Sequence, residues 1–135
     1  MLQVKEIQYK DDFYDVTIVV KQGTLSDGMR RNALQGEAIA SKKGADLPEN
    51  LGQLVAVHYI PSCIAATASI ENRGAQSISA EPTFEEFMEY PDALVDLWVS
   101  LIWELNPHWS PFGRRLAAQD SLTENSNSGT DEETK

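Results

Sequence analysis

The segment 91–105 constrains the fold more than any other part of the chain, because it is apolar on nearly every side. Its large apolar side chains are separated by three or four residues, which is the spacing of an α-helix. Polar side chains recur only at strict intervals of four and so form one narrow strip. The large apolar residues are Leu94, Leu97, Trp98, Leu101, Ile102 and Leu105, and the polar strip is Asp92, Asp96, Ser100 and Glu104.

Such a helix needs cover on two sides. An ordinary surface helix carries an apolar stripe of roughly 100°, whereas here Val95, Val99 and Trp103 fill most of the surface that remains. These three side chains would form an exposed apolar patch if they faced water. Two interpretations stay open. The helix is the centre of the core, or it packs one face on the core and another on a partner protein or a second copy of the chain.

Two groups of residues are candidates for contact with a partner. The first consists of aliphatic and aromatic side chains on this helix and just after it. The second is an arginine pair near residue 30, which is either solvated or in contact with an acidic partner. The candidate partner-binding residues are Val95, Trp98, Val99, Ile102, Trp103, Trp109, Arg30 and Arg31.

Residues 3–21 are predicted to form a β-hairpin. Apolar and polar side chains alternate from Tyr14 to Val20, which indicates a strand. A change of phase near Glu6 suggests a bulge in the strand before it. Because a hairpin alone is only marginally stable in water, this one must pack on helices or pair its edge with another chain.

A helix is predicted from Thr24 to about Ser41. Thr24 and Asp27 have the spacing of a capping box, and Gly44 follows the last turn. Small side chains on one face would allow another element to approach closely. That face is formed by Leu25, Met29, Ala33, Gly36 and Ala40.

Further helices are expected in the second half of the chain. Pro48 suits the first turn of a helix that should end near Ile60, because Pro61 disfavours helical geometry in the residue before it. Residues 62–70 are interpreted as another helix, with a strand of small residues as the alternative. A full capping box at Thr83 predicts a short helix there.

Together these elements predict an α+β domain over residues 1–115, in which an N-terminal β-hairpin is followed by four to five packed helices. Residues 116–135 are polar and acidic and are expected to be a disordered tail. The chain has 21 acidic and 11 basic residues and a net charge of -10, which disfavours binding to nucleic acid or anionic membranes. No apolar run reaches the roughly 18 residues of a membrane span, so a cytosolic location is expected.

No pattern of residues predicts catalysis. The chain has two histidines, His58 and His108, and one cysteine, Cys63, which lies in an apolar context. These are too few for a common metal site, and the usual phosphate-binding, nucleophile and zinc-protease motifs do not occur. We therefore expect a protein that is not an enzyme and that needs no cofactor or metal.

One stretch of sequence resembles a known family. It begins with Phe84-Glu85-Glu86-Phe87, continues through an apolar helix with tryptophan, and closes with Leu105-Asn106-Pro107-His108-Trp109. This pattern is similar to the C-terminal half of the tail assembly chaperones of long-tailed bacteriophages. The first 31 residues are compatible with the N-terminal part of that family.

The resemblance implies a non-structural assembly factor of the host cytoplasm. Its main partner would be the tape-measure protein, which it keeps soluble during tail assembly. The tail tube protein is a second candidate partner, and a homo-oligomer is a third arrangement that stays open. Two alternatives to this function remain. One is a structural head–tail or tail-terminator protein of the virion, and the other is an acidic inhibitor that mimics nucleic acid.

Overall fold

The computed structural model describes residues 2–47 and 51–112, and these form an α+β fold with a three-stranded antiparallel sheet. The predicted fold class is thus confirmed, whereas the predicted tail lies outside the described residues. The elements, in chain order, are β1 (Val4–Lys10), β2 (Asp15–Lys21), α1 (Leu25–Ser41), α2 (Leu51–Gln53), the π-helical segment η2 (Leu54–Tyr59), α3 (Ile60–Ala66), β3 (Thr67–Asn72), α4 (Phe84–Met88), α5 (Asp92–Leu105) and the 3-10 turn η3 (Pro107–Trp109).

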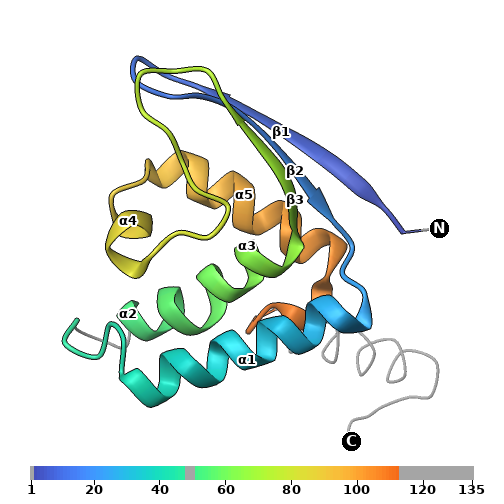
Figure 1. Ribbon diagram of the computed structural model, residues 1–135, viewed down its shortest axis with the longest axis vertical. Helices are drawn as coiled ribbons and strands as arrows, with labels where there is room; N and C mark the ends of the chain where they lie inside the picture. The colour runs from blue at the N-terminus through green and yellow to red at the C-terminus, as the bar shows by residue number, and fades with distance from the viewer. Residues whose placement is uncertain (1, 48–50, 113–135) are drawn as a thin grey trace, which may run out of the picture.

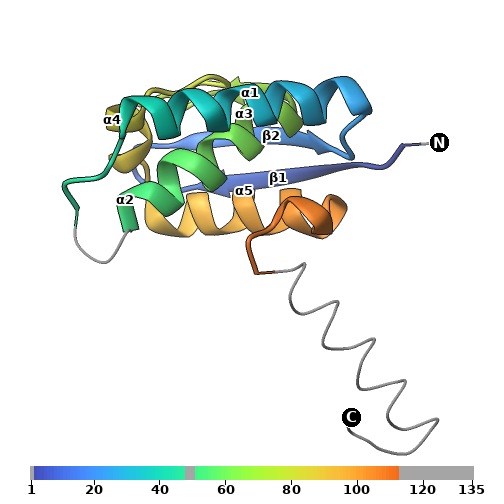
Figure 2. The ribbon, with the colours of Figure 1, turned by 90° about the horizontal axis from the view of Figure 1, so that it is seen from below.

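The elements are stacked in three layers (Figure 1). The sheet, in the order β1-β2-β3, forms the first layer, and α5 and α3 cover one of its faces. The helix α1 forms the third layer, because it packs on α3 and η2 rather than on the sheet. Figure 2 shows α1 and α5 on opposite sides of α3.

The core lies between the sheet and α5. Alternation along β2 points Val16, Ile18 and Val20 to one face, and all three are fully buried. From α5, the fully buried Leu94 and Trp98 belong to the same core cluster. The strongly apolar helix is therefore the central helix of the core, which is one of the two interpretations that the sequence leaves open.

The sheet differs from the predicted hairpin in two respects. The strands β1 and β2 pair in an unbroken register from Val4 to Lys10, so the bulge expected near Glu6 is absent; a register shift occurs instead between Val19 and Val20, where β2 faces β3. The third strand agrees with the alternative interpretation of residues 62–70, and the prediction of a helix over that whole range is wrong. The strand is stabilised by its pairing with β2. That pairing is not visible in the local sequence, so the sequence alone does not distinguish the strand from a helix.

The helical run also continues through Pro61, where an end is expected from the sequence. Tyr59 and Ile60 both keep helical backbone angles, and the turn before the proline is widened into a π-helix. Pro61 has no N–H to donate to the carbonyl of Val57. The side-chain amide of Gln35 in α1 donates a hydrogen bond to that carbonyl at 2.9 Å. A bond from another element therefore replaces the one that the helix itself cannot form.

Candidate protein-binding surface

The structure buries most of the residues predicted to contact a partner. Trp98 and Ile102 are fully buried, and Val99 and Trp109 are 4% exposed. The indole N–H of Trp98 donates to the Thr67 hydroxyl at 2.9 Å, which satisfies its only polar group inside the core. Their own chain covers these four residues, so in this structure they offer no surface to a partner.

The remaining two candidates on α5 are half buried. Trp103 packs edge-on against Tyr59, with ring centroids 5.4 Å apart, and against Phe112 at 6.4 Å. Its indole N–H points to the Ser62 hydroxyl at 3.4 Å. Val95 is also half buried. Aromatic side chains of the same molecule therefore cover part of Trp103, and both Trp103 and Val95 pack against the core.

The two arginines have different roles. Arg31 is half buried and lies over the ring of Trp109, 5.3 Å from its centroid, and its guanidinium donates to the Trp109 carbonyl at 2.7 Å. Burial lowers the pKa of Arg31, yet the group remains a cation at any ordinary pH. Arg30 forms an exposed ion pair with Glu81 at 2.9 Å. Arg31 thus fastens α1 to the domain, and only Arg30 faces solvent.

The Asn-Pro-His-Trp motif after α5 joins three parts of the chain. Asn106 is fully buried and accepts a hydrogen bond from the Gly23 N–H at 2.7 Å. Its amide donates to the carbonyls of Lys21 and Ile102, both at 3.1 Å. A Cβ on Gly23 would lie 2.7 Å from the Trp109 ring, so only glycine fits there. The motif that carries the family resemblance therefore has a structural role in this molecule.

Among the described residues, the three most exposed large apolar side chains are on α1. None of the residues of this helix is buried, and Leu25, Met29 and Ile39 are 82%, 63% and 62% exposed. Residues at helical spacing between them are small and also exposed. We call this surface the α1 stripe; it consists of Leu25, Met29, Ala33, Gly36, Ile39 and Ala40. No described element lies on the outer side of α1 (Figure 1).

The orientation of α1 follows from its polar residues. The capping box starts the helix, since the Thr24 hydroxyl accepts from the Asp27 N–H at 3.2 Å and Asp27 accepts from the Thr24 N–H at 2.9 Å. Arg31 and Gln35 then anchor the inner face through hydrogen bonds to buried carbonyls. With polar groups directed inward, the apolar stripe is left on the outside, which is the reverse of an ordinary amphipathic helix.

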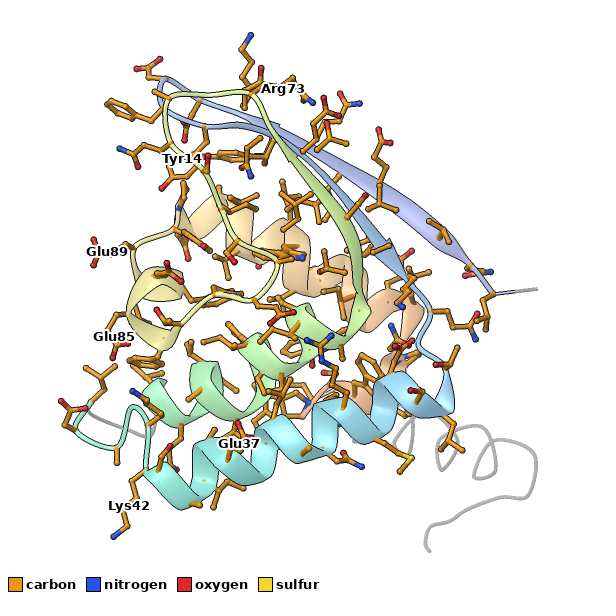
Figure 3. The ribbon with its side chains drawn as sticks, in the orientation of Figure 1. Tyr14, Glu37, Lys42, Arg73, Glu85 and Glu89 are labelled. Carbon is orange, nitrogen blue, oxygen red and sulfur yellow. The ribbon has the colours of Figure 1, made fainter. Side chains whose placement is uncertain are left out.

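The α1 stripe carries no charged side chain. Its charged neighbours are Arg30 and Glu37 at its edge and Lys42 after the end of the helix, where Lys42 points away from the molecule (Figure 3). A Cβ added to Gly28 or to Gly36 would meet no neighbouring heavy atom within 4 Å. The packing of this molecule therefore does not require the two glycines. Small residues on a helix face let another helix approach closely.

The groups that could carry chemistry are placed as follows. Burial raises the pKa of the Cys63 thiol well above its usual value, which keeps it protonated. Burial, followed by the nearby charge of Arg31, lowers the pKa of His58, whose Nδ1 lies 3.5 Å from the Gln35 amide. Among the residues that the structure describes, no three histidine, cysteine or acidic side chains are grouped to hold a metal ion.

Within the described ranges, no helix combines the length and the apolar character needed to cross a membrane. Comparisons with protein-family models, with curated proteins and with solved structures find no match.

Proposed function

We propose that this protein is a non-catalytic tail assembly chaperone that holds an apolar helical segment of a tape-measure protein on the α1 stripe. The observation that carries the proposal is the uncharged, uncovered apolar face of α1, with Leu25, Met29 and Ile39 largely exposed. Exposed apolar surfaces of this kind mark sites of protein interaction. The sequence pattern of residues 84–109 supports the class of protein.

The shape of the stripe favours a helix as the bound segment. Ala33, Gly36 and Ala40 are exposed and small, so the backbone of a second helix can come close along the centre of α1. Leu25 and Met29 precede the small residues along the helix and Ile39 adjoins Ala40, so these three side chains supply larger apolar contacts toward both ends of the stripe. A methionine adapts its shape to different neighbours, which suits a surface that must accept successive segments of a long client.

The charge of the chain supports the same role. A net charge of -10 keeps a complex soluble even when its client is apolar. A tape-measure protein offers many similar helical segments, so many copies of the chaperone can bind along it. Each contact then needs only modest affinity, because neighbouring copies shield the client together.

Co-expression with a tape-measure protein tests the proposal. We expect the client to be soluble with the unchanged chain and to elute with it in size-exclusion chromatography. The double substitution Leu25→Glu and Met29→Glu should abolish both results, because it places charge in the apolar contact. Both sites are exposed, so folding should change by less than about 0.5 kcal/mol.

Phe13→Glu is the matched control, because Phe13 is 59% exposed but lies in the turn between β1 and β2, away from α1. This variant should keep the client soluble. The proposal fails if the unchanged chain forms no complex with the client, or if the α1 variant and the Phe13 variant behave alike.

A further inference from the structure

The strand β1 has an unpaired edge in the described part of the molecule, because the sheet order is β1-β2-β3. Backbone bonds from Gln22 to Gln3 and from Asp11 to Tyr14, both 2.8 Å, show that odd-numbered residues of β1 bond to β2. In an antiparallel pair the bonding direction alternates along the strand. The N–H and C=O groups of Glu6 and Gln8 therefore point outward, away from β2.

A groove runs between this edge and α5. Its volume is about 400 Å³, and both apolar and acidic residues line it. Leu97, one of the apolar residues, is 47% exposed, which is unusual on a helix that is otherwise the centre of the core. We call the apolar lining residues the base and the acidic lining residues the rim; the base is Ile7, Leu97 and Leu101, and the rim is Glu6, Asp96 and Glu104.

The charges at the rim indicate which partner fits. Glu104 is paired with Lys5, whereas within the described residues Glu6 and Asp96 have no ion-pair partner. A second copy docked edge to edge would bring an identical acidic rim against the first, and like charges in close contact are unfavourable. A segment with lysine or arginine would be attracted instead.

We propose that the edge of β1 accepts an extended segment of a partner protein as a fourth strand, with apolar and basic side chains alternating along it. Its backbone bonds to the outward groups of Glu6 and Gln8. Side chains alternate between the two faces of a strand, so its apolar side chains point to Leu97 and Leu101 on the α5 side and its basic side chains point to Glu6 on the opposite face. Strand addition of this kind takes affinity from main-chain bonds and specificity from alternate side chains. This site is separate from the α1 stripe.

Calorimetric titration with a capped peptide of about eight alternating valine and lysine residues tests the proposal. Saturable binding is expected, and the peptide with glutamate in place of lysine should bind at least about tenfold more weakly. In nuclear magnetic resonance, the valine–lysine peptide should slow the hydrogen exchange of the Gln8 amide.

Gln8→Pro is the sharpest variant. It removes an outward N–H, which an edge strand tolerates, while the bonds between β1 and β2 remain. The affinity for the valine–lysine peptide should fall about tenfold, which corresponds to one lost hydrogen bond. Gln8→Ala, which keeps the N–H, should bind normally. Glu6→Lys should reverse the preference between the two peptides, whereas Asp92→Lys, outside the groove, should not.

The proposal is overturned if neither peptide binds saturably, if the two bind equally, or if Gln8→Pro folds and binds as tightly as Gln8→Ala. It is also overturned if sedimentation shows a dimer that Gln8→Pro dissociates, since the occupant would then be a second copy. The α1 variant Leu25→Glu with Met29→Glu should bind the peptide normally. Failure at the β1 edge is therefore distinguishable from failure of the chaperone proposal.

Discussion

At the scale of single residues, the end of α5 depends on Asn106. Its side chain accepts one hydrogen bond and donates two. The bonds with Gly23 and Lys21 link the end of α5 to the end of β2, and the third bond, to a carbonyl of α5, closes the last turn of that helix itself. Because Asn106 is fully buried, water cannot replace these bonds when the side chain is removed. Trp109, which follows closely, packs against Gly23 and Arg31 on the same side.

Asn106→Ala should lower the free energy of unfolding by about 2 to 3 kcal/mol, because buried polar groups of Gly23 and Lys21 lose their partner. Urea denaturation measures this loss. Asn32→Ala is the matched control. Asn32 is exposed on α1, so the control should leave stability unchanged or raise it slightly through helix propensity. Equal losses for the two variants would contradict the role of Asn106.

His58 gives the stability a dependence on pH. Its pKa is lowered in the folded state, first by burial and then by Arg31. The unfolded chain therefore binds the proton more readily, and stability falls as the pH drops below the usual histidine value of about 6.5. His58→Gln should reduce the loss of melting temperature between pH 7.5 and pH 5.5, measured by circular dichroism. A loss as large as that of the unchanged chain would show that other groups cause it.

At the scale of the elements, local signals were predictable and tertiary contacts were not. The capping boxes at Thr24 and Thr83 mark the starts of α1 and α4, and both are present in the structure. The strand β3 could not be distinguished from a helix, because its identity depends on pairing with β2. The end expected before Pro61 is absent for a similar reason, since Gln35 stabilises the continuous helix from another element.

The position of the candidate surface also depends on tertiary contacts that the sequence does not reveal. Spacing alone identified an apolar face on α1, but which face points outward is decided by the contacts of Arg31 and Gln35. The apolar excess of α5 was also visible. Its cover by Tyr59 and Phe112 was not, because both aromatics come from other parts of the chain. We therefore propose the client surface on α1 rather than on the side of α5 that carries Trp103.

Substitutions at Gly36 test the stability of α1 and its proposed role in client binding independently. A Cβ there meets no atom of a neighbouring element, so Gly36→Ala should raise the free energy of unfolding by roughly 0.5 to 1 kcal/mol. Gly36→Leu should be at least as stable as the unchanged chain but should weaken client binding, because a large side chain keeps a second helix at a distance. Thermal unfolding and a pull-down with the client measure the two effects. Undiminished binding of the leucine variant would contradict close helix packing on the stripe.

At the scale of the whole molecule, the layers leave two different surfaces open. The α1 stripe is apolar and uncharged and lies on the layer farthest from the sheet (Figure 1). Within the described residues, the groove at β1 has an unpaired strand edge and an acidic rim. A helix fits the first and an extended basic segment fits the second, so one small domain has room to hold a client and a second partner together.

A photo-crosslinking amino acid placed at single positions tests the central claim most directly. Ala33 lies in the middle of the α1 stripe, and Ser69 is an exposed residue of β3. With a tape-measure client co-expressed, irradiation should give a covalent complex from position 33 and none from position 69. Crosslinking from position 69 with none from position 33 would contradict the assignment of the client to α1.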